Sequence, residues 1–316
     1  KRYWFYLISL LVLIPGIISL GLFGIRLGVE FSSGTTMTLH FEQEVSQADL
    51  RQALAELGHS EAIIQRTGED YFVRATRLAR EQKDDQGNIV APAEIDTLKK
   101  GLGERFGSVK LLDFFDVSPV VAGETTRNAA IAVAVASVGI VLYVAWAFRK
   151  TARSFRFGLC AIVPLLHDVL LVLGIFSILG RFFKMEVNAA FIMAILTVIG
   201  YSVNDKVVVF DRIRENQLRH PNEDFATVVN NSLVGTLARS LNTGMATLFV
   251  LAALLLFGGA TIRDFVLAMF IGIISGTYSS IFNASQLMVS WEYDDFGRLW
   301  RKTPFGRLRA TRPRAS

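Results

Sequence analysis

Two ionisable residues stand within or beside apolar stretches of this 316-residue chain, where charge is costly to bury. Asp205 lies between Gly200-Tyr201-Ser202-Val203-Asn204 and a run from Val207 to Phe210, and Arg239 precedes a second apolar stretch. A charge at membrane depth costs about 2.5–3.5 kcal/mol. At about 1.5 Å of rise per residue, Asp205 lies about 9 Å and Arg239 about 13 Å from the middle of two predicted membrane helices. Both are displaced toward the same side, so the two side chains can meet if these helices are neighbours.

An aspartate and an arginine in this arrangement could carry out proton transfer. Desolvation favours the protonated carboxyl, whereas a nearby arginine, which is always charged, favours the ionised form. A helix movement that changes the distance between Asp205 and Arg239 would therefore make the carboxyl release or bind a proton. The alternative is a structural ion pair of Asp205 with Lys206 or Arg239.

A second polar pair, His167-Asp168, lies near the centre of another apolar stretch. Consecutive residues of a helix point about 100° apart, so both cannot face one narrow pathway, and a structural role is favoured here. The other polar candidates for the pathway are Ser202, Asn204, Asn242 and Thr243. Gly272, Gly276, Ser280 and Ala284 are four residues apart and form a small-residue stripe for helix packing, either within this chain or with a partner.

Several kinds of chemistry are not expected. The single cysteine, Cys160, excludes an intramolecular disulfide or a cysteine-based metal site and reads as a small buried hydrophobe. There is no Gly-x4-Gly-Lys-Ser/Thr loop for nucleotide phosphates, and no residue set resembles a hydrolase. We expect no enzymatic activity, no cofactor and no metal. The net charge of +5 comes from residues at the ends of apolar runs rather than on one face, so no nucleic-acid partner is expected.

These residues require membrane helices to position them. Hydrophobic residues make up 52% of the chain, too many for a soluble globule of this kind. Six segments have the roughly 20 apolar residues that a bilayer core requires. They lie near residues 4–24, 128–148, 155–179, 187–210, 240–257 and 262–289.

The positive-inside rule gives an orientation. Arg149, Lys150, Arg153 and Arg156 crowd one loop, whereas the next loop holds only Arg181, Lys184 and Glu186. The tail adds Arg298, Arg301, Lys302, Arg307, Arg309, Arg312 and Arg314. Both termini are therefore predicted to be cytoplasmic, and the large insert after the first helix to face outward.

The insert is predicted to be a ferredoxin-like α+β domain with the order β-α-β-β-α-β. Strand patterns cover residues 37–41, 62–66, 71–75 and 109–115. Ser46 and Asp49 can cap one helix that ends at Gly58, and Pro92 opens another that reaches Phe106. Residues 80–88 read as a loop. The predicted organisation is a first membrane helix (1–25), the α+β domain (26–127), five helices (128–290) with a cytoplasmic amphipathic segment (221–238), and a basic tail (291–316). That segment either lies on the membrane surface or packs on the helix bundle.

The motifs resemble those of the SecF family, the smaller subunits of the SecDF protein-export factor in the resistance-nodulation-division superfamily. The most specific match is Gly200-Tyr201-Ser202-Val203-Asn204-Asp205 followed by Val207-Val208-Val209-Phe210-Asp211-Arg212-Ile213-Arg214-Glu215-Asn216. Ala238-Arg239-Ser240-Leu241-Asn242-Thr243 and Gly276-Thr277-Tyr278-Ser279-Ser280-Ile281-Phe282 support it. Glu30-Phe31-Ser32-Ser33-Gly34-Thr35 stands where the family usually has Asp-Phe-x-Gly-Gly-Thr, and Lys206 where it commonly has Thr.

The resemblance implies a subunit of the bacterial inner membrane that works with SecD beside the SecYEG channel. It would use the proton motive force to help finish preprotein translocation, with Asp205 as proton carrier and Arg239 as its switching partner. YajC and the insertase YidC are further implied partners, besides the preprotein and the lipid bilayer. Since the two subunits are sometimes fused, a start at Lys1 suits a cleaved or excised half. The alternatives are a proton-driven exporter of lipids or small molecules from the same superfamily, and a non-transporting scaffold of the translocon.

Overall fold

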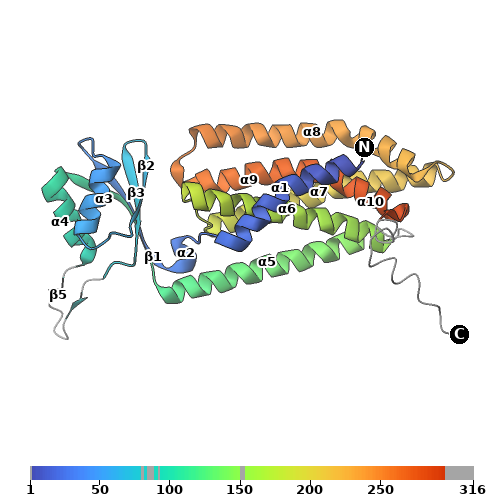
Figure 1. Cartoon of the computed structure of the whole chain (residues 1–316). Coiled ribbons are helices and arrows are strands. Elements are labelled where there is room, and N and C mark those ends of the chain that lie inside the picture. The colour runs from blue at the N-terminus through green and yellow to red at the C-terminus, as the bar shows by residue number, and fades with distance from the viewer. Residues whose placement is uncertain (1, 80–81, 84–88, 92, 150–153, 296–316) are drawn as a thin grey trace. The chain divides into compact units, whose positions relative to one another are not determined.

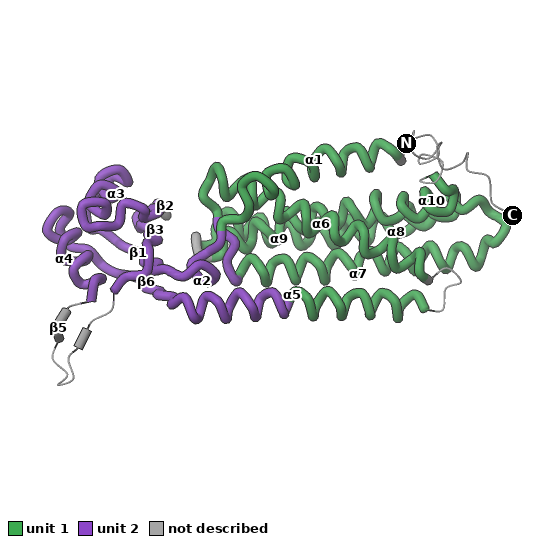
Figure 2. The backbone as a smooth tube through the Cα atoms, turned by 60° about the horizontal axis from the view of Figure 1, so that its bottom comes forward, with its two compact units in different colours: residues 1–26, 133–185, 190–316 green, residues 27–132, 186–189 purple. Residues whose placement is uncertain are grey.

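The computed structural model describes residues 2–79, 82–83, 89–91, 93–149 and 154–295. Lys150, Arg153, Pro92 and the basic residues of the predicted tail lie outside them. The chain divides into two compact units, coloured separately in Figure 2. A membrane unit comprises residues 1–26, 133–185 and 190–316, and an α+β unit comprises residues 27–132 and 186–189.

Six helical segments are long and apolar enough to cross a membrane, as expected (Figure 1). They are α1 (Arg2–Phe23), α5 (Pro119–Ala147), α6 (Ser154–Phe183), α7 (Ala189–Arg219), α8 (Phe225–Phe257) and a last span. This span consists of α9 (Ala260–Tyr278), the π-helical η1 (Ser279–Ala284) and α10 (Ser285–Glu292). Only 6% of the most apolar window of α5 and 17% of that of α8 are buried within the chain. These helices therefore present most of their apolar surface to lipid or to another protein.

Helix α8 differs from the prediction in one respect. The amphipathic segment 221–238 and the span that follows it are not separate elements, because α8 runs without a break from Phe225 to Phe257. No proline interrupts this stretch, and Val229 and Leu233 belong to the same hydrophobic cluster as Phe210 and Ile213 of α7. The first part of α8 is therefore an extension of a membrane helix that packs on the bundle.

Helix α7 is also longer than predicted. Its 31 residues correspond to about 46 Å at 1.5 Å per residue, against a hydrocarbon core of about 30 Å. The charged residues after Phe210 continue the same helix, and Asn216 donates a hydrogen bond of 2.8 Å to Ser232 of α8. Two neighbouring helices thus extend together beyond the apolar region.

The α+β unit contains a four-stranded antiparallel sheet and two helices. The sheet has the order β2-β3-β1-β6, with β1 at Gly34–Phe41, β2 at Ile63–Thr67, β3 at Asp70–Ala75 and β6 at Val109–Val117. Alternate residues of β1 (Met37, Leu39 and Phe41) are buried with the apolar faces of α3 (Gln47–Glu56) and α4 (Glu94–Phe106). Ser46 caps α3 as predicted, accepting a hydrogen bond from the amide of Asp49.

Three short elements were not predicted. Residues 29–32 form the single turn α2 (Val29–Ser32), and Gln82–Lys83 (β4), within the predicted loop, pairs with Ile89–Ala91 (β5), directly after it. The rest of that loop lies outside the described residues.

The segment between α6 and α7 belongs to the α+β unit rather than to the membrane unit. The amide of Gly28 donates to Val187 O at 2.8 Å, and the amide of Ala189 donates to Glu30 Oε2 at 2.5 Å. Arg74 of β3 forms an ion pair with Glu186. Residues 186–189 are therefore held in the α+β unit by backbone and side-chain bonds, although residues 186–188 directly precede α7 and Ala189 begins it.

Candidate functional site

Asp205 contacts α8 through one carboxylate oxygen. Its Oδ1 accepts a hydrogen bond of 2.6 Å from Ser240, one residue after Arg239. Its Oδ2 is buried and has no hydrogen-bond partner among the described residues. A buried carboxylate oxygen without a donor is costly unless it binds a proton or a donor supplied from elsewhere. The geometry of Asp205 thus leaves one carboxylate oxygen open to a proton.

Arg239 does not reach Asp205 in this structure. Its side chain is exposed, and no ion pair joins it to Asp205 in the part of the chain that the structure describes. The helices are neighbours at this level, as the hydrogen bond from Ser240 shows. Asn204, Asn242 and Thr243 are exposed as well. Four of the polar residues singled out from the sequence therefore lie on outer surfaces of α7 and α8.

A second polar centre surrounds Asp168 of α6. Asp168 and Lys206 of α7 are both fully buried, with Lys206 Nζ 2.9 Å from Asp168 Oδ2. Lys206 therefore pairs with Asp168. The ion pair between Asp205 and Lys206 that was one alternative from the sequence is not formed in this structure. His167 lies on the same helix, with its Nδ1 3.2 Å from Asp168 Oδ1. Its Nε2 is buried and meets no hydrogen-bond partner in the part of the chain that the structure describes.

Three serines complete this centre. Ser202 and Ser279 donate to Asp168 Oδ2 at 2.7 and 2.6 Å, and Ser275 donates to Oδ1 at 2.8 Å. They come from α7, η1 and α9, so three parts of the bundle meet at one carboxylate. Of the predicted pathway residues, Ser202, His167 and Asp168 are brought together here, apart from Asp205 and Ser240.

The small-residue stripe packs against another helix of the same chain. A Cβ atom on Gly272 would lie 2.3 Å from Val198 Cγ2, and one on Gly276 would lie 3.2 Å from Ser202. Ser280 donates to Gly276 O, and Ala284 is fully buried. The glycines thus let α9 approach α7 closely at Val198 and Ser202.

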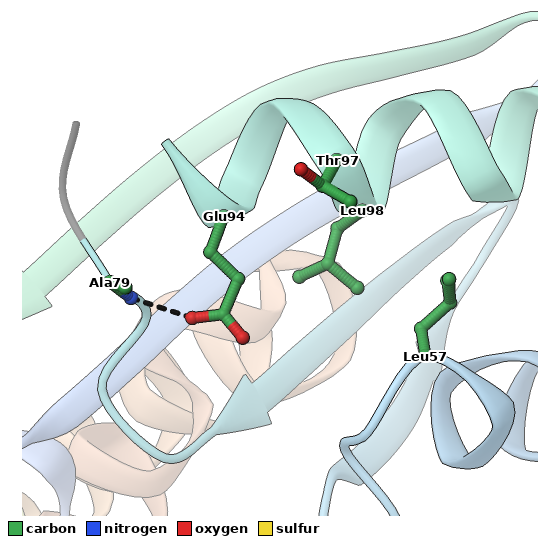
Figure 3. Close-up of a pocket in the computed structure, with 5 residues that line it drawn as sticks. All are labelled: Leu57, Ala79, Glu94, Thr97 and Leu98. Atoms are coloured by element: carbon green, nitrogen blue, oxygen red, sulfur yellow. Dashed lines mark hydrogen bonds between the residues drawn. The ribbon is translucent and has the colours of Figure 1, made fainter. Parts of the chain in front are cut away.

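A pocket in the α+β unit contains none of the residues considered for proton transfer. It is lined by Leu57, Ala79, Glu94, Thr97 and Leu98, and Glu94 accepts a 2.6 Å hydrogen bond from the amide of Ala79 (Figure 3). The lining is largely apolar, and its one carboxylate is already bonded to the backbone. These residues do not form a set of catalytic groups. No cluster of His, Cys, Asp or Glu able to hold a metal occurs in the described ranges.

Comparison with known proteins identifies the family. The family model described as protein export membrane protein SecD/SecF, C-terminal, matches residues 97–294, and the SecD/SecF GG motif matches residues 18–45. A SecF protein translocase subunit of Thermobaculum terrenum is 50% identical over 306 residues, which are 96% of each chain. The chain belongs to the SecF family. A second SecF subunit, from Anaerolinea thermophila, is 38% identical over 96% of each chain.

Fused relatives are longer. The SecDF subunit of Bacillus subtilis is 33% identical over 92% of this chain but only 37% of its own length. The crystal structure of SecDF from Thermus thermophilus, titled a translocon-associated membrane protein, superposes with a TM-score of 0.78 at 36% identity. It matches 92% of this chain, which spans 38% of that SecDF chain. The chain is thus a multi-pass protein translocase subunit equivalent to one part of SecDF.

The SecF motifs contain only Ser202 and Ser279 of the centre around Asp168, so its assembly could not be predicted from them. Ser202 and Lys206 are four residues apart on α7, and Ser275 and Ser279 are four apart on the last span. This spacing places each pair on one helix face. The spacing does not predict that both helix faces meet at Asp168. The π-helical turn that carries Ser279 also has no clear sequence signal.

Proposed function

We propose that this chain is the SecF subunit of a proton-driven SecD–SecF complex and that Asp205 is its proton carrier. The observation that carries the proposal is the contrast between the fully buried Asp168 and the half-buried Asp205. Asp168 has both oxygens bonded, including one to a cation, whereas Asp205 keeps a buried oxygen that has no hydrogen-bond partner among the described residues. A carboxyl can cycle a proton only if no fixed cation already compensates its charge.

Arg239 is the switching partner in this proposal. It lies next to Ser240, which already contacts Asp205, so a rotation or shift of α8 would bring the guanidinium toward the carboxylate. Such an approach favours the ionised form and releases the proton. Each charge moved across the membrane provides about 2.3 kcal/mol per 100 mV, which is enough to bias a helix movement.

SecD completes the pathway. The fused relatives support this partner, since they carry the matching region within one longer chain. The exposed Arg239, Asn242 and Thr243 on α8 also support it, because polar side chains at membrane depth normally face a protein or an aqueous cavity rather than lipid. SecYEG, YajC and YidC are proposed as partners on family grounds alone.

The α+β unit is proposed to be a ferredoxin-like domain on the outer side of the bacterial inner membrane, with both termini cytoplasmic. Its strand order β2-β3-β1-β6 and its two helices after β1 and before β6 support this assignment. The cluster of basic residues between α5 and α6 supports the orientation. Movement of this domain, or of its SecD counterpart, would hold the emerging preprotein and prevent it from sliding back through SecYEG.

The test is proton-gradient-dependent completion of preprotein translocation in inverted membrane vesicles that contain SecD and SecYEG. Asp205→Asn is expected to abolish the stimulation by the gradient while leaving assembly with SecD intact. Asp211→Asn, a side chain 68% exposed two turns further along the same helix, is the matched control and should retain stimulation. Unchanged stimulation with Asp205→Asn would refute the role of this carboxyl. Loss of stimulation without loss of assembly would also exclude a pure scaffold, and copurification of a lipid or drug in place of SecD would favour the exporter.

A further inference from the structure

The ammonium group of Lys206 is saturated by its surroundings. Its three N–H groups meet three acceptors: Asp168 Oδ2 at 2.9 Å, Ser279 Oγ at 3.0 Å and Ser202 Oγ. The side chain has no solvent exposure. A lysine without access to water stays charged only where a carboxylate and further acceptors replace its hydration, and this site supplies all of them.

The partner carboxylate is saturated as well. Asp168 Oδ2 accepts from Lys206, Ser202 and Ser279, and Oδ1 accepts from Ser275. The titratable groups that face it are Lys206 and His167. A protonated Asp168 could direct its O–H only toward a serine hydroxyl, which would have to turn its own hydrogen away, because the ammonium has no lone pair to accept it. The arrangement therefore fits an ionised carboxylate bound to a charged amine.

We propose that Lys206 is a positioning residue, a tethered cation that keeps Asp168 permanently charged and thereby assigns proton binding to Asp205 alone. This inference rests on the proposed function of Asp205. A proton or a dissolved cation can diffuse away from a buried carboxylate when the bundle rearranges. The ammonium of Lys206 cannot diffuse away, because its side chain is covalently attached to α7. Asp168 then connects α6, α7 and α9 permanently, and of Asp168 and Asp205 only Asp205 can cycle a proton.

Infrared difference spectroscopy of the complex with SecD, in buffers with choline as the only added cation, can test this assignment. A protonated carboxyl has its own C=O band, so each aspartate that binds a proton on acidification contributes one. The wild type is expected to show a band that disappears in Asp205→Asn. Lys206→Met, which keeps the length and loses the charge, is expected to add a second band, because a buried carboxylate without a cation takes up a proton. Lys206→Met with Asp168→Asn should lose that second band.

Ser275→Ala is the matched control, and it keeps the inference falsifiable if Lys206→Met does not assemble. This variant removes one hydrogen bond from Asp168 but leaves the ammonium in place, so no second band is expected. A second band in Ser275→Ala would show that hydroxyl groups rather than Lys206 keep Asp168 ionised, and would overturn the inference. The absence of a second band in assembled Lys206→Met would overturn it too. A band that persists in Asp205→Asn would instead contradict the proposed function, while the Asp168 result could still be read.

Discussion

Asp205 and Lys206 are consecutive residues of α7, yet their side chains contact different helices. Asp205 accepts a hydrogen bond from Ser240 of α8, whereas Lys206 bonds Asp168 of α6. The angle of about 100° between neighbours on a helix separates the two contacts. Helix α7 therefore carries a fixed ion pair on one face and a carboxyl with an unbonded oxygen on another, so α8 can move relative to Asp205 without breaking the bonds to α6.

Ser33 occupies a backbone conformation that suits glycine. Its φ of 61° and ψ of 162° lie in a region essentially restricted to glycine, at a cost of about 1–3 kcal/mol for other residues. Ser33→Gly is expected to stabilise the protein by about 1 kcal/mol. Ser33→Ala keeps the Cβ atom and should give no such gain. Thermal unfolding of the purified protein in detergent measures both, and equal stability of the two variants would contradict the argument.

A close contact between two glycines determines how α1 packs on α6. A Cβ atom on Gly174 would lie 2.6 Å from Gly16 Cα, a backbone atom that cannot turn aside. Gly174→Ala is expected to destabilise the membrane unit by about 1–3 kcal/mol through overpacking. The measurement is the apparent melting temperature in detergent.

Gly139→Ala is the control for this substitution. Gly139 lies within α5 and a Cβ there would meet nothing within 4 Å. The added methyl group should be neutral or stabilise the helix by up to about 1 kcal/mol. If both alanines had the same effect, the close approach of α1 and α6 would not be important for stability.

Arg74 attaches the segment before α7 to the α+β unit. It pairs with Glu186 and also donates to Leu27 O at 3.0 Å and to Ser32 Oγ at 2.6 Å. Arg74→Met should weaken this attachment by about 1–3 kcal/mol because three acceptors lose a charged donor. Hydrogen exchange of the amides at 187–189 should then accelerate by roughly tenfold or more, since 1.4 kcal/mol corresponds to a factor of ten.

A second arginine–glutamate pair of the same unit is the control. Arg66 pairs with Glu44, but their side chains are 48% and 82% exposed. Exposed pairs contribute about 0–1 kcal/mol, so Arg66→Met should leave exchange at 187–189 unchanged. Equal exchange rates in wild type and Arg74→Met would show that the backbone bonds of Gly28 and Ala189 suffice to hold the segment.

The membrane helices and the main strands of this protein could be predicted because each depends on a local pattern. Six apolar runs of membrane length and four strands between turn residues all occur near their expected positions. Contacts between helices could not be predicted in the same way. The spacing of Ser202 and Lys206 defines a helix face, but Asp168 as the common partner follows only from how α6, α7 and α9 pack. The continuity of α8 was missed because a change from an amphipathic to an apolar pattern does not require a break in the helix.

Arg239 should act on Asp205 only when α8 moves, since the two side chains are not paired in this structure. Arg239→Gln is expected to abolish the gradient-dependent stimulation of translocation, as Asp205→Asn does. If the residues form one switch, the double variant should be no worse than either single variant, because effects within one interacting pair are not additive. Arg263→Gln, which removes an exposed arginine from the first turn of α9, should retain stimulation and serves as the control. Partial, additive losses from Arg239→Gln and Asp205→Asn would indicate separate roles, and the guanidinium would then more simply serve as a contact to SecD or to lipid.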